Sequence, residues 1–89
     1  MHQSRPGTVL ADVVAAIRTV TGLEQVDAAD RLEGDLQLES VDLVTLDGLL
    51  QQRYGAGVDL LGFVADLDID QLIGLTVSDV VGRVEAVTS

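Results

Sequence analysis

The residue of this sequence with the clearest chemical potential is Ser40, which begins an apolar, helix-like segment and stands among Asp35, Glu39 and Asp42. A hydroxyl at the amino end of a helix lies at the positive end of the helix dipole, where a phosphate ester is well tolerated. The ordinary alternative is that the Ser40 side-chain oxygen caps the helix, which is the usual role of a serine in that place. Both roles, an esterified serine and a helix cap, remain open on the residue types.

Catalysis by a nucleophile and a general base is disfavoured by the composition. The chain has no Cys and no Lys, and its one His is His2. That histidine falls in residues 1–7, which we expect to be disordered. A serine without a neighbouring base is a weak nucleophile, so we expect a protein that is not an enzyme.

A calcium site is also disfavoured, although Asp66, Asp68 and Asp70 have the spacing that opens a calcium-binding loop. The sixth position of such a loop needs Gly and the twelfth needs Glu. Here these positions hold Gln71 and Val77. We therefore expect no metal cofactor.

The charge of the chain restricts its partners. The 89 residues carry 15 acidic side chains against 5 basic ones, all Arg, for a net charge of -10. Nucleic acid and anionic membrane surfaces are poor partners for such a chain, whereas a protein with a basic patch is attracted. The polar N-terminus matches neither a secretory signal nor a membrane span, so we expect a cytoplasmic monomer that contacts no membrane.

Apolar residues spaced by three and four predict an all-α fold with three longer helices in one domain spanning residues 1–89. The first lies between Thr8, a plausible N-cap, and Gly22. The second covers residues 41–54 and ends at Gly55. The third covers residues 77–87.

The third helix carries two local polar signals. Thr76 and Asp79 have the spacing of a capping box at its start. Asp79 and Arg83 lie four residues apart, which favours an ion pair along the helix.

The segments between the long helices are predicted to be short helices and one long loop. Helical spacing recurs at residues 60–67 and 69–73. Residues 22–39 have no helical period, and a structureless stretch of that length is unusual in a small domain. We expect its isolated apolar residues to pin this loop to the core; they are Leu23, Val26, Leu32, Leu36 and Leu38.

The helix at 41–54 has apolar residues on two opposite faces. Leu43, Leu46, Leu49, Leu50 and Tyr54 share the face that must form the core. Val41 and Val44 lie nearly opposite. Either the 22–39 loop covers this second face, or it is exposed for a partner.

The run Asp35-Leu36-Gln37-Leu38-Glu39-Ser40-Val41-Asp42 resembles the attachment motif of acyl carrier proteins, Asp-Leu-Gly-x-Asp-Ser-Leu. The resemblance extends to the first helix, the long loop and the Leu75–Val81 opening of the last helix, and so covers nearly the whole chain. It implies an acyl-carrier-type helical bundle in which a phosphopantetheinyl transferase attaches 4'-phosphopantetheine to Ser40. The arm would then present acyl or aminoacyl thioesters to an acyltransferase, a ketosynthase or acyl-loading enzymes.

The resemblance also implies a docking surface for basic partner enzymes at the head of the second helix. We assign to it Asp35, Leu38, Glu39, Val41, Asp42, Val44 and Asp47.

Three departures from the family pattern favour a role in polyketide or related specialised metabolism over fatty-acid synthesis. Glu39 and Val41 replace the usual Asp and Leu beside the serine. The outer face of the second helix carries Thr45, Gln51 and Gln52 where fatty-acid carriers tend to have acids, and the stretch from Tyr54 to Leu75 is longer than in those carriers. The Gly-Gly-x-Ser-Leu form of peptidyl carriers is absent. The alternative function is an unmodified acidic helical adaptor that docks a basic protein.

Overall fold

The apolar spacing of the sequence produces helices in the computed structural model, which describes residues 8–88. The elements are α1 (Thr8–Thr21), α2 (Ser40–Tyr54), the 3-10 turn η1 (Ala56–Val58), α3 (Leu60–Ala65), α4 (Ile69–Ile73) and α5 (Val77–Thr88). Within the described residues there is no strand, and a single isolated bridge joins Arg31 to Thr76. The predicted all-α fold is confirmed. The expected disorder of residues 1–7 and the cap assigned to the Thr8 side chain lie outside the described part of the chain.

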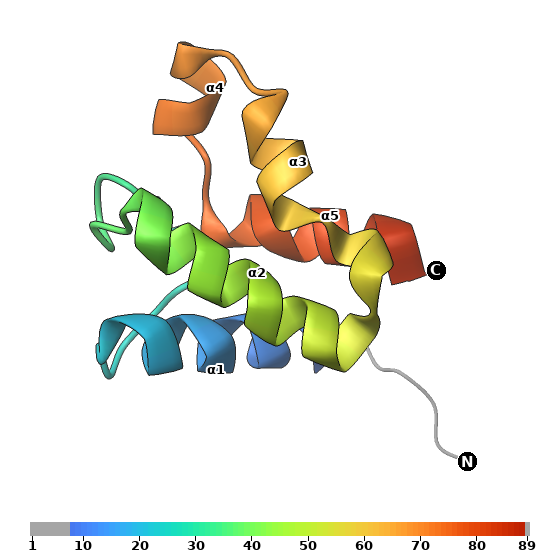
Figure 1. Ribbon diagram of the computed structural model, residues 1–89. Coiled ribbons are helices and arrows are strands. Elements are labelled where there is room, and N and C mark those ends of the chain that lie inside the picture. The colour runs from blue at the N-terminus through green and yellow to red at the C-terminus, as the bar shows by residue number, and fades with distance from the viewer. Residues whose placement is uncertain (1–7, 89) are drawn as a thin grey trace.

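Three long helices form the base of the molecule, and α3 and α4 stand above it (Figure 1). Helix α1 contacts both α2 and α5, and η1 joins the end of α2 to α5. Both predicted glycine stops are confirmed: Gly22 and Gly55 have φ angles of +77° and +95°, which L-residues rarely adopt. Their N–H groups donate to Arg18 and Gln51 at 2.8 and 2.7 Å, closing the helix ends.

One aliphatic core runs through the bundle, and every long helix and the 22–39 loop contribute to it. Its buried members are Val13, Ile17, Val26, Leu32, Leu36, Leu38, Leu46, Leu50, Val58, Leu60, Leu75, Val77, Val80 and Val84. Four of the five apolar loop residues therefore pin the loop as predicted. Leu23 does not, since it is exposed.

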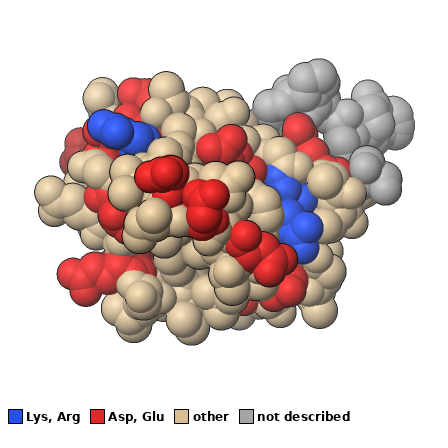
Figure 2. Space-filling model, turned by 90° about the horizontal axis from the view of Figure 1, so that it is seen from above, with Lys and Arg blue, Asp and Glu red and all other residues tan. Residues whose placement is uncertain are grey.

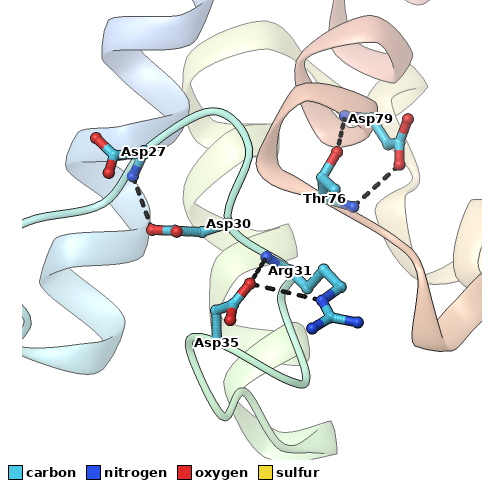
Figure 3. Close-up of polar contacts among 6 residues, drawn as sticks. All are labelled: Asp27, Asp30, Arg31, Asp35, Thr76 and Asp79. Carbon is cyan, nitrogen blue, oxygen red and sulfur yellow. Dashed lines mark hydrogen bonds and ion pairs between the residues drawn. The ribbon is translucent and has the colours of Figure 1, made fainter.

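The loop is also tied to the start of α5 by backbone hydrogen bonds. The N–H of Leu32 donates to the Leu75 carbonyl at 3.0 Å, and the N–H of Val77 donates to the Asp30 carbonyl at 2.9 Å. Within the loop, Asp35 Oδ2 accepts the Arg31 N–H at 2.8 Å and lies 3.6 Å from Arg31 Nε (Figure 3). These contacts fix the path of the chain just before α2.

The start of α5 confirms one sequence prediction and contradicts another. The N–H of Thr76 donates to Asp79 Oδ2 at 3.0 Å, and the N–H of Asp79 donates to Thr76 Oγ1 at 3.2 Å, so the capping box is present (Figure 3). The predicted ion pair between Asp79 and Arg83 is absent from residues 8–88. Asp79 turns back to its own helix start, and Arg83 Nε donates instead to the Val58 carbonyl at 3.0 Å.

Candidate functional site

Ser40 is the first residue of α2, and its side chain is exposed. The capping residue is Glu39, whose backbone is extended, and its N–H donates to Asp42 Oδ2 at 3.0 Å. Of the two roles left open for Ser40, the helix cap is therefore not the one observed, because the N-cap is the preceding residue. Among the described residues, the Ser40 hydroxyl has no protein hydrogen-bond partner.

The hydroxyl therefore lies at the amino end of a 15-residue helix and is available for chemistry. The first N–H groups of a helix have no partner within it, and together with the dipole they favour an anion nearby. A phosphate ester on Ser40 would meet this favourable field.

The acidic residues around Ser40 also support the local backbone. Asp42 is half-buried and accepts the Glu39 N–H, while Asp35 is exposed and pairs with Arg31. Glu39 is exposed beside Ser40. Glu39 and Asp42 thus lie beside Ser40 at the start of α2, and Asp35 lies in the loop that precedes it.

The second apolar face of α2 is exposed. Val41 and Val44 are 66% and 54% accessible, so the 22–39 loop does not cover them. They are one turn apart on α2, and Val41 directly follows Ser40. Of the two arrangements that the sequence allowed, the uncovered face is the one observed.

Two residues assigned to the docking surface do not lie on it. Leu38 is 7% exposed, because the loop turns inward before α2 and the Leu38 N–H donates to the Leu32 carbonyl at 2.9 Å. Asp47 is also 7% exposed. Its Oδ1 accepts the Leu60 N–H at 2.8 Å and its Oδ2 accepts Gln51 Nε2 at 2.7 Å, so its carboxylate supports the fold.

Two exposed residues on α4 were missed by the sequence analysis as surface candidates. Ile69 and Ile73 are 69% and 47% accessible, and α4 has no buried residue. Figure 2 views the molecule from the side of α3 and α4 and shows acidic side chains across this face. A signal was present in the sequence, since a five-residue helix with apolar residues at 69, 72 and 73 has little room to bury all three.

A cleft of about 580 Å³ lies between α3, α4 and α5, with Phe63, Leu75 and Arg83 in its lining. The sequence left open a cleft around Leu43, Leu46, Phe63 and Ile73 or, equally, a filled core. Leu46 is fully buried in the core, and of those four residues only Phe63 lines the cleft. No residue of α2 contributes to it.

Within residues 8–88 no group of three or more His, Cys, Asp or Glu side chains has the arrangement of a metal site. None of the helices in this part of the chain combines the length and the apolar character that crossing a bilayer requires. Comparison of the chain with protein-family models, with characterised proteins and with solved structures gave no match.

Proposed function

We propose that this protein is an acyl-carrier-type protein that bears 4'-phosphopantetheine on Ser40 and presents acyl or aminoacyl groups to biosynthetic enzymes. The observation that carries the proposal is the exposed Ser40 hydroxyl at the head of α2, which is not used as the helix cap. The proposal is also supported by the run from Asp35 to Asp42, which resembles the attachment motif of acyl carrier proteins.

The residues at the head of α2 fit such a group. The hydroxyl is open to solvent, and the free N–H groups of the first helical turn favour the negative charge of a phosphodiester. In the attachment step Ser40 Oγ forms a bond to the phosphorus nearer the pantetheine of coenzyme A. The bond from that phosphorus to the bridging oxygen breaks, adenosine 3',5'-bisphosphate leaves, and a base of the transferase takes the serine proton. When bound, the group supplies a terminal thiol that carries acyl groups as thioesters.

The exposed residues beside Ser40 supply a contact for the partner enzymes. Val41 and Val44 offer apolar area, and the negative charge of Glu39 attracts a basic surface. Charges of this kind raise the rate and specificity of encounter more than the affinity, which suits a protein that must release each partner. The partners are a phosphopantetheinyl transferase and enzymes of the acyltransferase or ketosynthase type, in a polyketide-like pathway.

The proposal is tested by intact-mass measurement after incubation of the full chain with coenzyme A and several broad-specificity transferases. The wild-type protein should gain one phosphopantetheine, and Ser40→Ala should gain none. Ser78→Ala is the matched control, because Ser78 is also an exposed serine in the first turn of a helix. It should be modified like the wild type.

A wild-type protein that gains no mass with any transferase contradicts the proposal, as does modification that persists in Ser40→Ala. In that case the acidic adaptor is the better function. It requires that Ser40→Ala retain full biological activity.

A further inference from the structure

The cleft between α3, α4 and α5 combines apolar walls with one positive charge. Phe63 lines it from α3, Leu67 from the turn between α3 and α4, Leu75 from the segment after α4, and Ala86 from α5. Arg83 of α5 also lines it. Gln71 and Asp79 are the other polar residues of the lining. A concave, mostly apolar surface with a few well-placed polar groups is the usual form of a small-molecule site.

The Arg83 guanidinium is held in place but has no carboxylate partner in residues 8–88. Its Nε donates to the Val58 carbonyl at 3.0 Å, and its Cζ lies 5.6 Å from the centre of the Phe63 ring. By contrast, Arg31 and Arg53 each form an ion pair with an aspartate. Asp79, one turn before Arg83, also lines the cleft, but its Oδ2 accepts the Thr76 N–H.

The charge of Arg83 is therefore unpaired although the chain has three times as many acidic as basic side chains. With Nε occupied, the two Nη groups have no protein acceptor among the described residues. A guanidinium in this state is suited to a carboxylate, which accepts two parallel N–H bonds from it.

We propose that this cleft binds a small carboxylic acid with an apolar body, its carboxylate at Arg83 and its body along Phe63, Leu67 and Leu75. A phosphate is disfavoured, because one guanidinium offers a dianion few donors and the net charge of -10 repels the higher charge more strongly. The lining contains no residue of α2, so binding does not require modification of Ser40.

The test uses sodium octanoate as the probe and octanol as the uncharged probe with the same chain length. Each is titrated into the isotope-labelled full chain, and backbone amide shifts are followed by two-dimensional NMR. Octanoate should give saturable shifts centred on Phe63, Gly74 and Gly82, and octanol should bind about tenfold more weakly, since a hydrogen bond to a charged group is lost.

Two variants separate binding from folding. Arg83→Gln should weaken octanoate binding about tenfold. Gly82→Leu should fill the cleft and abolish binding, yet keep the fold, because a Cβ at Gly82 meets no atom within 4 Å and Leu is a better helix former than Gly. Gly48→Leu on α2 is its matched control, because Gly48 is also an open helical glycine but lies outside the cleft. It should bind octanoate like the wild type.

Three results would each overturn the inference. They are the absence of saturable octanoate shifts at the cleft, equal binding of octanoate and octanol, and a folded Gly82→Leu protein that binds octanoate as tightly as Gly48→Leu does.

Discussion

The carboxylate of Asp47, in the middle of α2, accepts the backbone N–H of Leu60, the first residue of α3, at 2.8 Å. This buried hydrogen bond joins two helices through residues that are 13 positions apart in the sequence. The second oxygen of Asp47 accepts the side-chain amide of Gln51. Asp47 therefore positions α3 on α2 and takes no part in the exposed surface near Ser40.

Asp47→Ala should lower the free energy of unfolding by about 2 kcal/mol, because it removes a charged acceptor and leaves a buried N–H unsatisfied. Asp47→Asn keeps one oxygen for Leu60 and should lose less than about 1 kcal/mol. Urea denaturation followed by circular dichroism measures both. An alanine variant as stable as the wild type would show that the carboxylate does not hold α3.

Gln37 has a φ of +57°, a left-handed conformation that costs an L-residue roughly 1–2 kcal/mol. Gln37→Gly removes that cost, although Gly loses more backbone entropy on folding. We predict a net gain of about 0.5 kcal/mol for Gln37→Gly and a loss of about 1 kcal/mol or more for Gln37→Val, because a β-branched side chain tolerates positive φ least. Urea denaturation of both variants checks this order of stability. A valine variant that is more stable than the glycine variant would contradict the prediction.

Tyr54 is half-buried, and its hydroxyl donates a hydrogen bond to Asp12 on α1, which also pairs with Arg53 Nε at 2.9 Å. Burial, the hydrogen bond to Asp12 and the negative charge of Asp12 raise the pKa of Tyr54 from 10 to about 12. Tyr54 is the only Tyr in a chain without Trp, so the ultraviolet absorbance of tyrosinate reports it alone. We predict a titration midpoint near pH 12, lowered in Asp12→Asn; a wild-type midpoint near 10 would contradict the prediction.

The same pKa shift makes stability depend on pH. The folded-state pKa of Tyr54 lies above the unfolded value, so its contribution is complete below about pH 10 and is lost as the pH rises toward about 12. The free energy of unfolding of the wild type should therefore fall over this window. Tyr54→Phe should show a smaller fall over the same range. Chemical denaturation at a series of pH values gives both slopes, and equal slopes would exclude this role of Tyr54.

The exposed face of α2 should contribute to enzyme encounters if the proposed function holds. The double variant Val41→Thr, Val44→Thr keeps shape and charge but removes apolar area, and it should reduce kcat/KM of the transferase about tenfold. Its stability should change by no more than about 0.5 kcal/mol per site, because both residues are exposed. Leu61→Thr, an exposed apolar residue on α3, is the control and should leave kcat/KM unchanged. Unaltered kinetics in the double variant would remove Val41 and Val44 from the docking surface.

Local sequence signals located most elements of this protein. The spacing of Val13 and Ile17, and of Val80 and Val84, defined buried helical faces, and Gly22 and Gly55 marked two helix ends. The Thr76–Asp79 capping box was also predictable from the sequence, because both of its hydrogen bonds lie within four residues. Such features depend on neighbours along the chain.

The candidate site could be predicted only in part, because some of its features depend on segments that are distant along the chain. The sequence placed Ser40 at the head of a helix but left open whether its side chain caps that helix, because the cap depends on where the loop enters α2. The family resemblance also assigned Asp47 to the docking surface, and only the path of α3 shows that it is buried.

An acidic all-α chain with a serine at the start of its second helix follows from the amino-acid sequence alone, because charge, periodicity and turn residues act locally. Which surfaces are covered depends on tertiary packing. It buried Leu38 and Asp47, exposed Val41 and Val44, and drew Arg83 away from Asp79 toward Val58 and Phe63. Each of these outcomes depends on contacts between segments distant in the chain, and no spacing within one helix specifies them.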